Sequence, residues 1–120
     1  MNETIETIRE NVKKIYNAID DKKAYDIKII DIGNVSVIAD YFILATASNT
    51  NQLEAILDAA DKVMNEQGIL PKQIEGGKNS PWILMDYGNI IVHLFTEEGR
   101  TFYDLERIWR DGEEVDIDSI

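Results

Sequence analysis

Two short apolar segments joined by a tight-turn dipeptide constrain the fold of this chain more than any other feature. Residues 82–85 read Trp-Ile-Leu-Met, and residues 90–95 read Ile-Ile-Val-His-Leu-Phe. Gly88-Asn89 lies between them and tolerates the positive φ angles of a two-residue hairpin turn. Apolar residues at successive positions indicate strands that are covered on both faces. The sequence therefore predicts a β-hairpin inside a layered domain, and Trp82 and Trp109 beside it suggest a docking surface as well as packing.

The first half of the chain predicts a helix, two strands and a second helix. Apolar residues recur at three- and four-residue steps from about Glu3 to Asp21, which predicts a helix with one apolar stripe. Residues 25–32 and 40–47 predict two strands, because both are rich in β-branched and aromatic side chains. A second amphipathic helix is expected after the capping side chains at 48–51, and Gly68 is well placed to end it.

The second half of the chain predicts three strands and a closing helix. Residues 71–75 begin with proline, which suits an edge strand, and the hairpin follows. A helix is expected from about Thr101 to Arg110, because Thr101 and Asp104 have the spacing of a capping box. The order α-β-β-α-β-β-β-α indicates an α/β domain with a mixed β-sheet and helices packed on it.

Length and composition fit a single domain. The 120 residues are 44% hydrophobic, which supplies one core. We assign residues 1–112 to this domain and expect the acidic residues 113–120 to be a mobile tail, since its only apolar anchors are Val115, Ile117 and Ile120. No apolar run approaches the ~20 residues that cross a bilayer, and the first residues lack the segments of a signal peptide. We therefore expect a cytoplasmic protein without membrane contact.

The chain is strongly acidic. Twelve basic and 23 acidic residues give a net charge of −11, and no Lys or Arg occurs between Lys28 and Lys62. Nucleic-acid binding needs a basic footprint, so we expect no direct nucleic-acid contact. Acidity aids solubility, and it also suits a basic protein partner that is approached by electrostatic steering. Charge alone leaves both interpretations open.

Patterns that would indicate catalysis are weak. The chain has no cysteine and a single histidine, His93, so a thiolate site and a multi-histidine metal site are both excluded. His93 lies between apolar residues, which is typical of a neutral, hydrogen-bonded core histidine. Asp31, Asp40 and Asp86 fall near expected strand ends, where carboxylates commonly form turns. We expect no enzyme activity, metal or cofactor; the alternative is a nucleotidyltransferase-like enzyme that holds magnesium with these three aspartates.

A series of short motifs occurs along the chain in a specific order and spacing. They are Asp40-Tyr41-Phe42-Ile43, Ser48, Glu75-Gly76, Trp82 through Gly88, Ile91 through Phe95, Glu98, Arg100, and Tyr103 through Trp109. In this order they resemble the ribosomal silencing factor family, also called Iojap, over about residues 5–110. The resemblance implies a fold related to nucleotidyltransferases without the catalytic motif, and a role without chemistry. The family usually has Gly-Asp in the hairpin turn, where this chain has Gly88-Asn89.

The resemblance also implies a partner. Members of the family bind the large ribosomal subunit through its fourteenth ribosomal protein, at the subunit-joining face. They sterically keep the small subunit away and so repress translation. The acidic charge of this chain is consistent with that partner, since ribosomal proteins are usually basic.

A few residues are candidates for partner contact. The set comprises hairpin residues and two acidic rim residues, namely Trp82, Asp86, Tyr87, Gly88 and His93 with Glu75 and Glu98. Trp82 and Tyr87 are the expected aromatic anchors, although a core position suits Trp82 equally well. We assign Trp109, Phe95 and Phe102 to the core. A homodimer whose hairpin edge pairs with itself is a further possibility.

Overall fold

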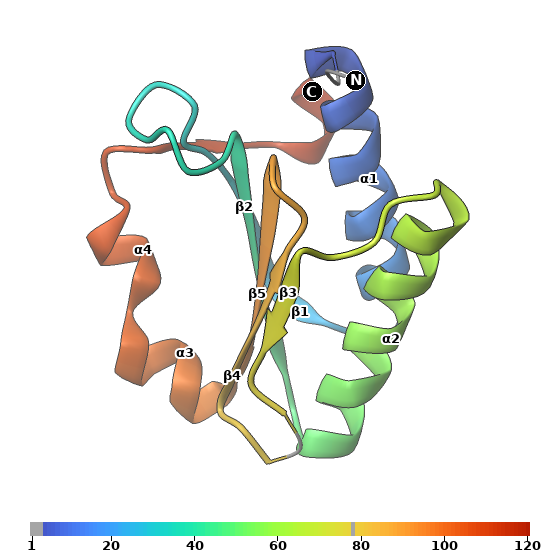
Figure 1. The fold of residues 1–120 in the computed structure, drawn as a ribbon. Coiled ribbons are helices and arrows are strands. Elements are labelled where there is room, and N and C mark those ends of the chain that lie inside the picture. Colours follow the sequence, from blue (N-terminus) through green and yellow to red (C-terminus); the bar gives the residue numbers. More distant parts are fainter. Residues whose placement is uncertain (1–3, 78) are drawn as a thin grey trace.

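One six-stranded sheet with helices on both faces forms the molecule (Figure 1). The structure is a computed structural model, and it describes residues 4–77 and 79–120. Its elements, in chain order, are α1 (Ile5–Asp21), β1 (Tyr25–Asp31), β2 (Tyr41–Ala47), α2 (Thr50–Glu66), β3 (Gln73–Glu75), β4 (Trp82–Asp86), β5 (Ile90–Thr96), α3 (Glu97–Tyr103), α4 (Leu105–Ile108), β6 (Glu113–Val115) and η1 (Ile117–Ser119).

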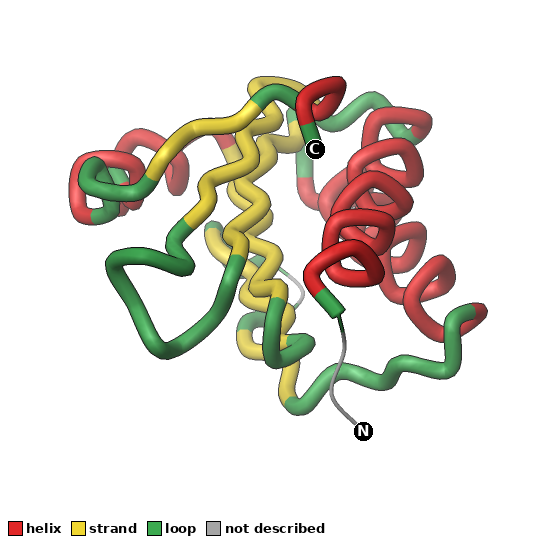
Figure 2. The backbone as a smooth tube through the Cα atoms, turned by 90° about the horizontal axis from the view of Figure 1, so that it is seen from above, coloured by secondary structure: helices red, strands yellow, loops and turns green. Residues whose placement is uncertain are grey.

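The strands lie in the order β3-β4-β5-β2-β1-β6. The central pair, β2 and β5, is parallel, and the other neighbouring pairs are antiparallel, so the sheet is mixed as the sequence predicts. Helices α1 and α2 cover one face, and α3 and α4 cover the other (Figure 2). The first eight elements follow the expected order. Across the described ranges, no helix combines the length and apolar composition that crossing a bilayer requires.

Each face of the sheet has its own core. The larger core lies under α1 and α2 and includes, among other residues, the apolar stripe of α1 together with Ile43, Ile83 and Val92 of the sheet. Helix α1 begins after Thr4, whose hydroxyl accepts the Thr7 N–H; the expected start at Glu3 lies outside the described residues. The smaller core lies under α3 and α4 and contains, among other residues, Phe42, Leu44, Ile91, Phe95 and Leu105.

The hairpin forms as the sequence predicts. Strands β4 and β5 pair from Trp82 opposite Phe95 to Asp86 opposite Ile91, and the Tyr87 N–H donates to the Ile90 carbonyl at 2.9 Å. Gly88 adopts φ 88°, a conformation that favours glycine. Six of the seven residues of β5 are buried, so both faces of this strand are covered. Strand β4 alternates between buried and half-buried residues, because α3 packs mainly on β5 and β2. Strand β3 pairs with Leu84, Met85 and Asp86 on the outer side of β4, so this part of the hairpin edge is already occupied.

The closing helix differs from the expectation. Helix α3 begins at Glu97, four residues earlier than expected, because the Thr96 hydroxyl accepts the Gly99 N–H at 3.1 Å and caps it. Asp104 adopts a left-handed conformation with φ 46°, which separates α3 from α4. The expected capping box at Thr101 is therefore wrong. Phe102 was assigned to the core and is 81% exposed, whereas Phe95 is fully buried and Trp109 packs on the smaller core.

Residues 113–120, for which the sequence predicts a mobile tail, pair and pack with the rest of the chain in the structure. Strand β6 pairs with Ile29–Asp31 of β1, and Val115, Ile117 and Ile120 pack on the larger core. The three apolar residues that were counted as weak anchors are sufficient because β1 offers them a sheet edge as well as a hydrophobic surface. We call residues 113–119, which include β6 and η1, the C-terminal strap.

Candidate functional site

Trp82 lies at the start of β4, on the sheet face that α3 covers. Its indole Nε1–H donates to Nδ1 of His93 at 3.1 Å. Its ring stacks on Phe95 at a centroid distance of 5.6 Å and contacts Tyr103 of α3 at 4.6 Å. The side chain is half-buried, so part of the indole stays at the surface. Trp82 therefore packs on the smaller core and also remains partly exposed to solvent.

His93 is buried in β5, with only 3% of its surface exposed. Because an indole N–H can only donate, Nδ1 of His93 is the acceptor, and the ring proton of the neutral form lies on Nε2. Burial lowers the pKa of His93 to about 3. His93 is thus the neutral, hydrogen-bonded histidine that the sequence predicts, and it positions the indole of Trp82.

Asp86, Tyr87 and Gly88 form the turn at the opposite end of β4, about 14 Å from Trp82 along a strand of this length. The Asp86 carboxylate accepts the Gly88 N–H at 2.8 Å, which fixes the turn. The Tyr87 hydroxyl donates to Asp61 of α2 at 2.8 Å, and burial, together with this bond, raises the pKa of Tyr87. Tyr87 is only 8% exposed, so it joins the hairpin to α2 and does not serve as a surface anchor.

The two acidic rim candidates lie on β3 and on α3. Glu75 pairs with Leu84 at the sheet edge, and Glu98 lies in the first turn of α3; both are exposed. The structure therefore separates the seven candidates. His93 bonds to Trp82, and Glu98 lies at the start of α3, beside the residue before Trp82, whereas the three turn residues lie at the other end of the hairpin. Glu75 lies opposite Leu84, midway between the two ends.

An ion network that sequence reasoning missed fixes α3 and α4 on the sheet. Arg100 is 8% exposed; its Nη1 donates to the Thr46 hydroxyl at 2.8 Å, and its Nε donates to Glu106 at 2.9 Å. Lys28 of β1 reaches the same carboxylate at 3.1 Å. Burial raises the pKa of Glu106, but the hydrogen bonds from Arg100 and Lys28 outweigh it and hold the pKa below its usual value. Arg100 and Glu106 are six residues apart, so no helical spacing rule indicates the pair.

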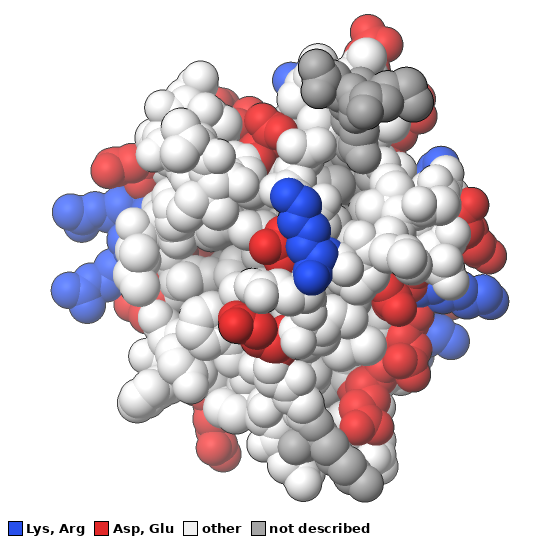
Figure 3. Space-filling view, in the orientation of Figure 1, with Lys and Arg blue, Asp and Glu red and all other residues white. Residues whose placement is uncertain are grey.

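An exposed apolar patch continues the surface around Trp82 onto α3 and α4. Phe102 and Ile108 are 81% and 68% exposed, and they line a hollow of about 490 Å³ together with Tyr103, Arg107 and Arg110. Tyr103 contacts both Trp82 and Phe102, so the hollow and the indole form one surface. We call this the Trp82 surface: Trp82, Glu98, Phe102, Tyr103 and Ile108. Figure 3 shows basic side chains projecting on the side that carries α4, while acidic ones are distributed around the visible face.

The three aspartates of the alternative hypothesis do not form a magnesium site. Asp31 accepts the Gly33 N–H at 3.0 Å, just as Asp86 accepts that of Gly88, so both stabilise turns. Strands β5 and β2 lie between Asp86 on β4 and Asp31 on β1. Within the described part of the chain, no three acidic or histidine side chains gather closely enough to hold a metal ion.

Comparisons with known proteins identify the family. The family model described as "Ribosomal silencing factor during starvation" matches residues 5–120. The chain is 35% identical over 112 residues to the ribosomal silencing factor RsfS of Halalkalibacterium halodurans, covering 93% of this chain and 96% of that protein. It is 37% identical over 101 residues to the RsfS of Bacillus subtilis, with 84% and 86% coverage. The chain belongs to the ribosomal silencing factor family, which confirms the resemblance.

More distant relatives and solved structures agree with this assignment. The chloroplastic Iojap protein of Arabidopsis thaliana is 31% identical over 103 residues, which cover 81% of this chain and 40% of that protein. A crystal structure of a Bacillus halodurans protein superposes with a TM-score of 0.80 at 33% identity, covering 90% of this chain and 98% of that chain. A Chromobacterium violaceum protein gives 0.82 at 28% identity, with 91% and 90% coverage. The mixed α/β fold is therefore shared with these proteins.

Proposed function

We propose that this protein binds the large ribosomal subunit through its fourteenth ribosomal protein, at the subunit-joining face, and keeps the small subunit away. It represses translation in the cytoplasm by contact and without catalysis. Membership of the ribosomal silencing factor family supports the ribosomal role. The observation that carries the docking hypothesis is the Trp82 surface, an exposed aromatic and aliphatic patch on a chain of net charge −11.

The composition of the Trp82 surface suits an interface with a basic protein. Tryptophan, tyrosine and phenylalanine supply a large share of the binding energy at protein interfaces. Phe102 is held at its edge by Tyr103 and is otherwise open to solvent, so a partner can bury most of its ring. Glu98 is an exposed member of this patch and Glu75 is exposed on the edge strand β3, and exposed carboxylates steer a basic partner.

We assign two roles to the seven candidate residues. Trp82, Glu98 and Glu75 contact the partner, together with Phe102, which the sequence placed in the core. The remaining four residues, His93, Asp86, Tyr87 and Gly88, hold the hairpin in the conformation that presents Trp82.

Phe102→Ala tests the docking surface with little effect on folding, because the side chain is exposed. We expect the substitution to weaken binding to purified large subunits by about 2 kcal/mol, about thirtyfold, at unchanged melting temperature. The matched control is Leu70→Ala, which removes another exposed apolar side chain outside the Trp82 surface and should bind normally. Equal losses for both variants would show that docking lies elsewhere.

Sedimentation through sucrose gradients tests the proposed function itself. The purified protein should co-sediment with large subunits and not with small ones. It should also lower the yield of joined ribosomes when both subunits are mixed. Equal recovery with both subunits, recovery with neither, or an unchanged yield of joined ribosomes would contradict the proposal.

A further inference from the structure

The sheet edge farthest from the hairpin is only half covered. Strand β6 pairs with Ile29, Ile30 and Asp31 of β1 and then leaves the edge. On the inner side, Tyr25 and Lys28 of β1 pair with β2, with an irregularity between them, and among the described residues no strand pairs with the outer side of residues 25–28. An open strand edge presents backbone N–H and C=O groups in the geometry that an additional strand requires.

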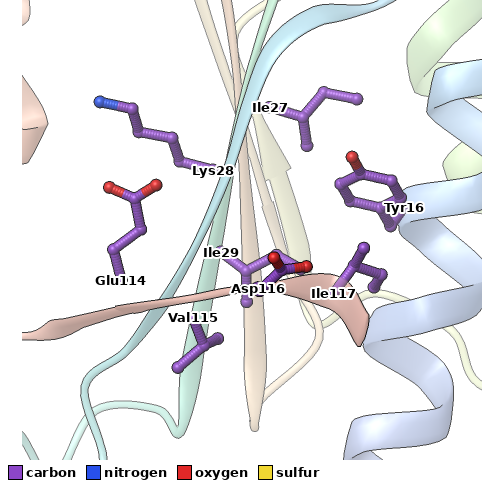
Figure 4. Close-up of a pocket in the computed structure, with 8 residues that line it drawn as sticks. All are labelled: Tyr16, Ile27, Lys28, Ile29, Glu114, Val115, Asp116 and Ile117. Atoms are coloured by element: carbon purple, nitrogen blue, oxygen red, sulfur yellow. The ribbon is translucent and has the colours of Figure 1, made fainter. Parts of the chain in front are cut away.

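A hollow of about 530 Å³ lies beside this open edge. Tyr16 of α1 and Ile27 of β1 form one side, and Val115 and Ile117 of the C-terminal strap form another (Figure 4). All four side chains are half-buried and already pack against the larger core, so they offer apolar surface that a further segment can cover. In Figure 4, Ile27 and Tyr16 lie on one side of β1, and Lys28 points to the other.

The charges around the hollow are predominantly acidic. Glu114 and Asp116 line it and are exposed, and Glu113 and Asp118 flank them on the strap. Lys28 is the basic residue of the lining, but its ammonium group is bonded to Glu106 at 3.1 Å on the α4 side of the sheet. A bound segment therefore meets more acidic than basic groups, and this favours basic side chains and disfavours phosphates.

We propose that an extended segment of a protein partner, rich in lysine or arginine, binds here and adds a strand to β1 beside β6. The strap already shows that this edge accepts a strand, because β6 occupies its other half. The segment is short, since only four residues of β1 are open and Asp26 bends the strand with φ 51°. The site shares no residue with the Trp82 surface, and β5 and β2 lie between Trp82 on β4 and this edge of β1. The proposal does not depend on the proposed function.

The first test uses synthetic peptides and the full chain, followed by amide chemical shifts in NMR. The probe is a blocked hexapeptide of alternating lysine and valine, which presents charge on one face and apolar side chains on the other. We expect saturable shifts of the amides of residues 25–28 and 114–117. A glutamate–valine hexapeptide and a lysine–valine hexapeptide with N-methylated valines should both fail to bind, since the first has the wrong charge and the second lacks strand donors.

The second test separates the site from net charge. The double variant Glu114→Gln and Asp116→Asn should bind the probe about fivefold more weakly, a loss typical of two exposed charge pairs. The matched double variant Glu54→Gln and Glu66→Gln, at exposed residues of α2, changes net charge equally and should bind within twofold of the unaltered protein. Equal losses in both variants, equal binding of the N-methylated peptide, shifts confined to other residues, or no saturable binding would overturn the proposal. None of these outcomes bears on ribosomal subunits, so the two proposals fail independently.

Discussion

At the scale of single residues, the hydrogen bond between Trp82 and His93 shows how a buried polar side chain can position a residue that lies partly at the surface. The imidazole accepts the indole N–H at 3.1 Å and lies edge-on to Phe42, with ring centroids 4.7 Å apart. A protonated imidazole cannot accept that hydrogen bond, so the position of Trp82 depends on a neutral ring. The stability of the fold should therefore depend on pH through this one residue.

The sign of this pH dependence follows from the two pKa values of His93. The unfolded chain binds a proton at His93 below about pH 6.5, whereas the folded chain does so only near pH 3. Between these values the unfolded state binds more protons, so the free energy of unfolding decreases as pH falls. At pH 5 we expect His93 to account for a loss of about 2 kcal/mol relative to pH 7.

Urea unfolding at pH 7 and pH 5 measures this loss, and His93→Gln is the matched variant. Glutamine keeps a hydrogen-bond acceptor but does not titrate, so the difference between the two proteins isolates His93 from the carboxylates. The variant should lose about 2 kcal/mol less than the unaltered protein over this range. The same pH dependence in both proteins would mean that His93 is protonated in the folded state or does not contribute.

At the scale of secondary-structure elements, α3 is held by an unusually close approach at Gly99. A Cβ atom added there would overlap the carbonyl oxygen of Pro81, which itself accepts the Thr96 N–H at 3.0 Å. Alanine normally favours a helix over glycine by about 1 kcal/mol, but here the overlap should outweigh that preference. The first turn of α3 therefore requires glycine at position 99.

Gly99→Ala should lower the free energy of unfolding by about 1–3 kcal/mol, the usual effect of overpacking. Gly77→Ala is the control, because its added Cβ meets nothing within 4 Å, and it should stay within about 0.5 kcal/mol of the unaltered protein. Thermal or urea unfolding of the two variants makes the comparison. A stabilised Gly99→Ala protein would contradict the close contact between α3 and Pro81.

The ion network around Arg100 joins α3 and α4 to β2 and β1. Lysine keeps the charge but cannot reach both Glu106 and the Thr46 hydroxyl as the guanidinium does. We expect Arg100→Lys to cost about 2 kcal/mol of stability in urea unfolding. Arg110→Lys, at an exposed arginine, should cost less than about 0.5 kcal/mol. Similar small losses for both would show that the network contributes little.

Elements whose own residues determine them could be predicted from the sequence. The stripe of α1, the continuous apolar runs of β2 and β5, and the turn at Gly88 each have a local physical cause, and all three appear in the structure. The start of α3 was misplaced because Thr96 and Thr101 both suit a helix cap. Only the contact between Gly99 and Pro81 favours the earlier residue.

The features that could not be predicted depend on distant contacts. The strap was expected to be mobile because its own sequence has few apolar residues, and in the structure it pairs with β1, more than 80 residues earlier. At the candidate site, the hydrogen bond from Trp82 to His93 is consistent with the hairpin register, but the exposure of Phe102 depends on how α3 lies on the sheet. A short sequence pattern contains no information about such partners.

At the scale of the whole molecule, net charge determines how the protein approaches a partner. A chain of charge −11 attracts a basic surface over a distance set by salt, about 10 Å at 0.1 M ionic strength. Exposed carboxylates near the contact contribute most to the rate of association and little to the lifetime of the complex. Glu98 lies at the Trp82 surface, while Glu66 is exposed at the end of α2 on the other face of the sheet.

Glu98→Lys should slow association with large subunits and flatten its dependence on sodium chloride, with a smaller change in the dissociation rate. Glu66→Lys changes net charge by the same amount and should have a weaker effect on both. Stopped-flow or surface binding kinetics at several salt concentrations provide the comparison. If the two variants behave alike, only the total charge matters and the Trp82 surface has no special role in association.

The parallel pairing of β2 and β5 also has a consequence for how quickly the protein folds. Each residue of β2 pairs with one 49 positions later, from Tyr41 with Ile90 to Ala47 with Thr96. A local hairpin such as β4–β5 closes within about 1–10 microseconds. The central pair must first close a long loop, and the entropy cost of that closure is offset only when the two strands meet. We therefore expect the pairing of β2 with β5 to be the slow step of folding. Until it forms, β5 exposes a continuous apolar strand, the state in which this protein is most prone to aggregate.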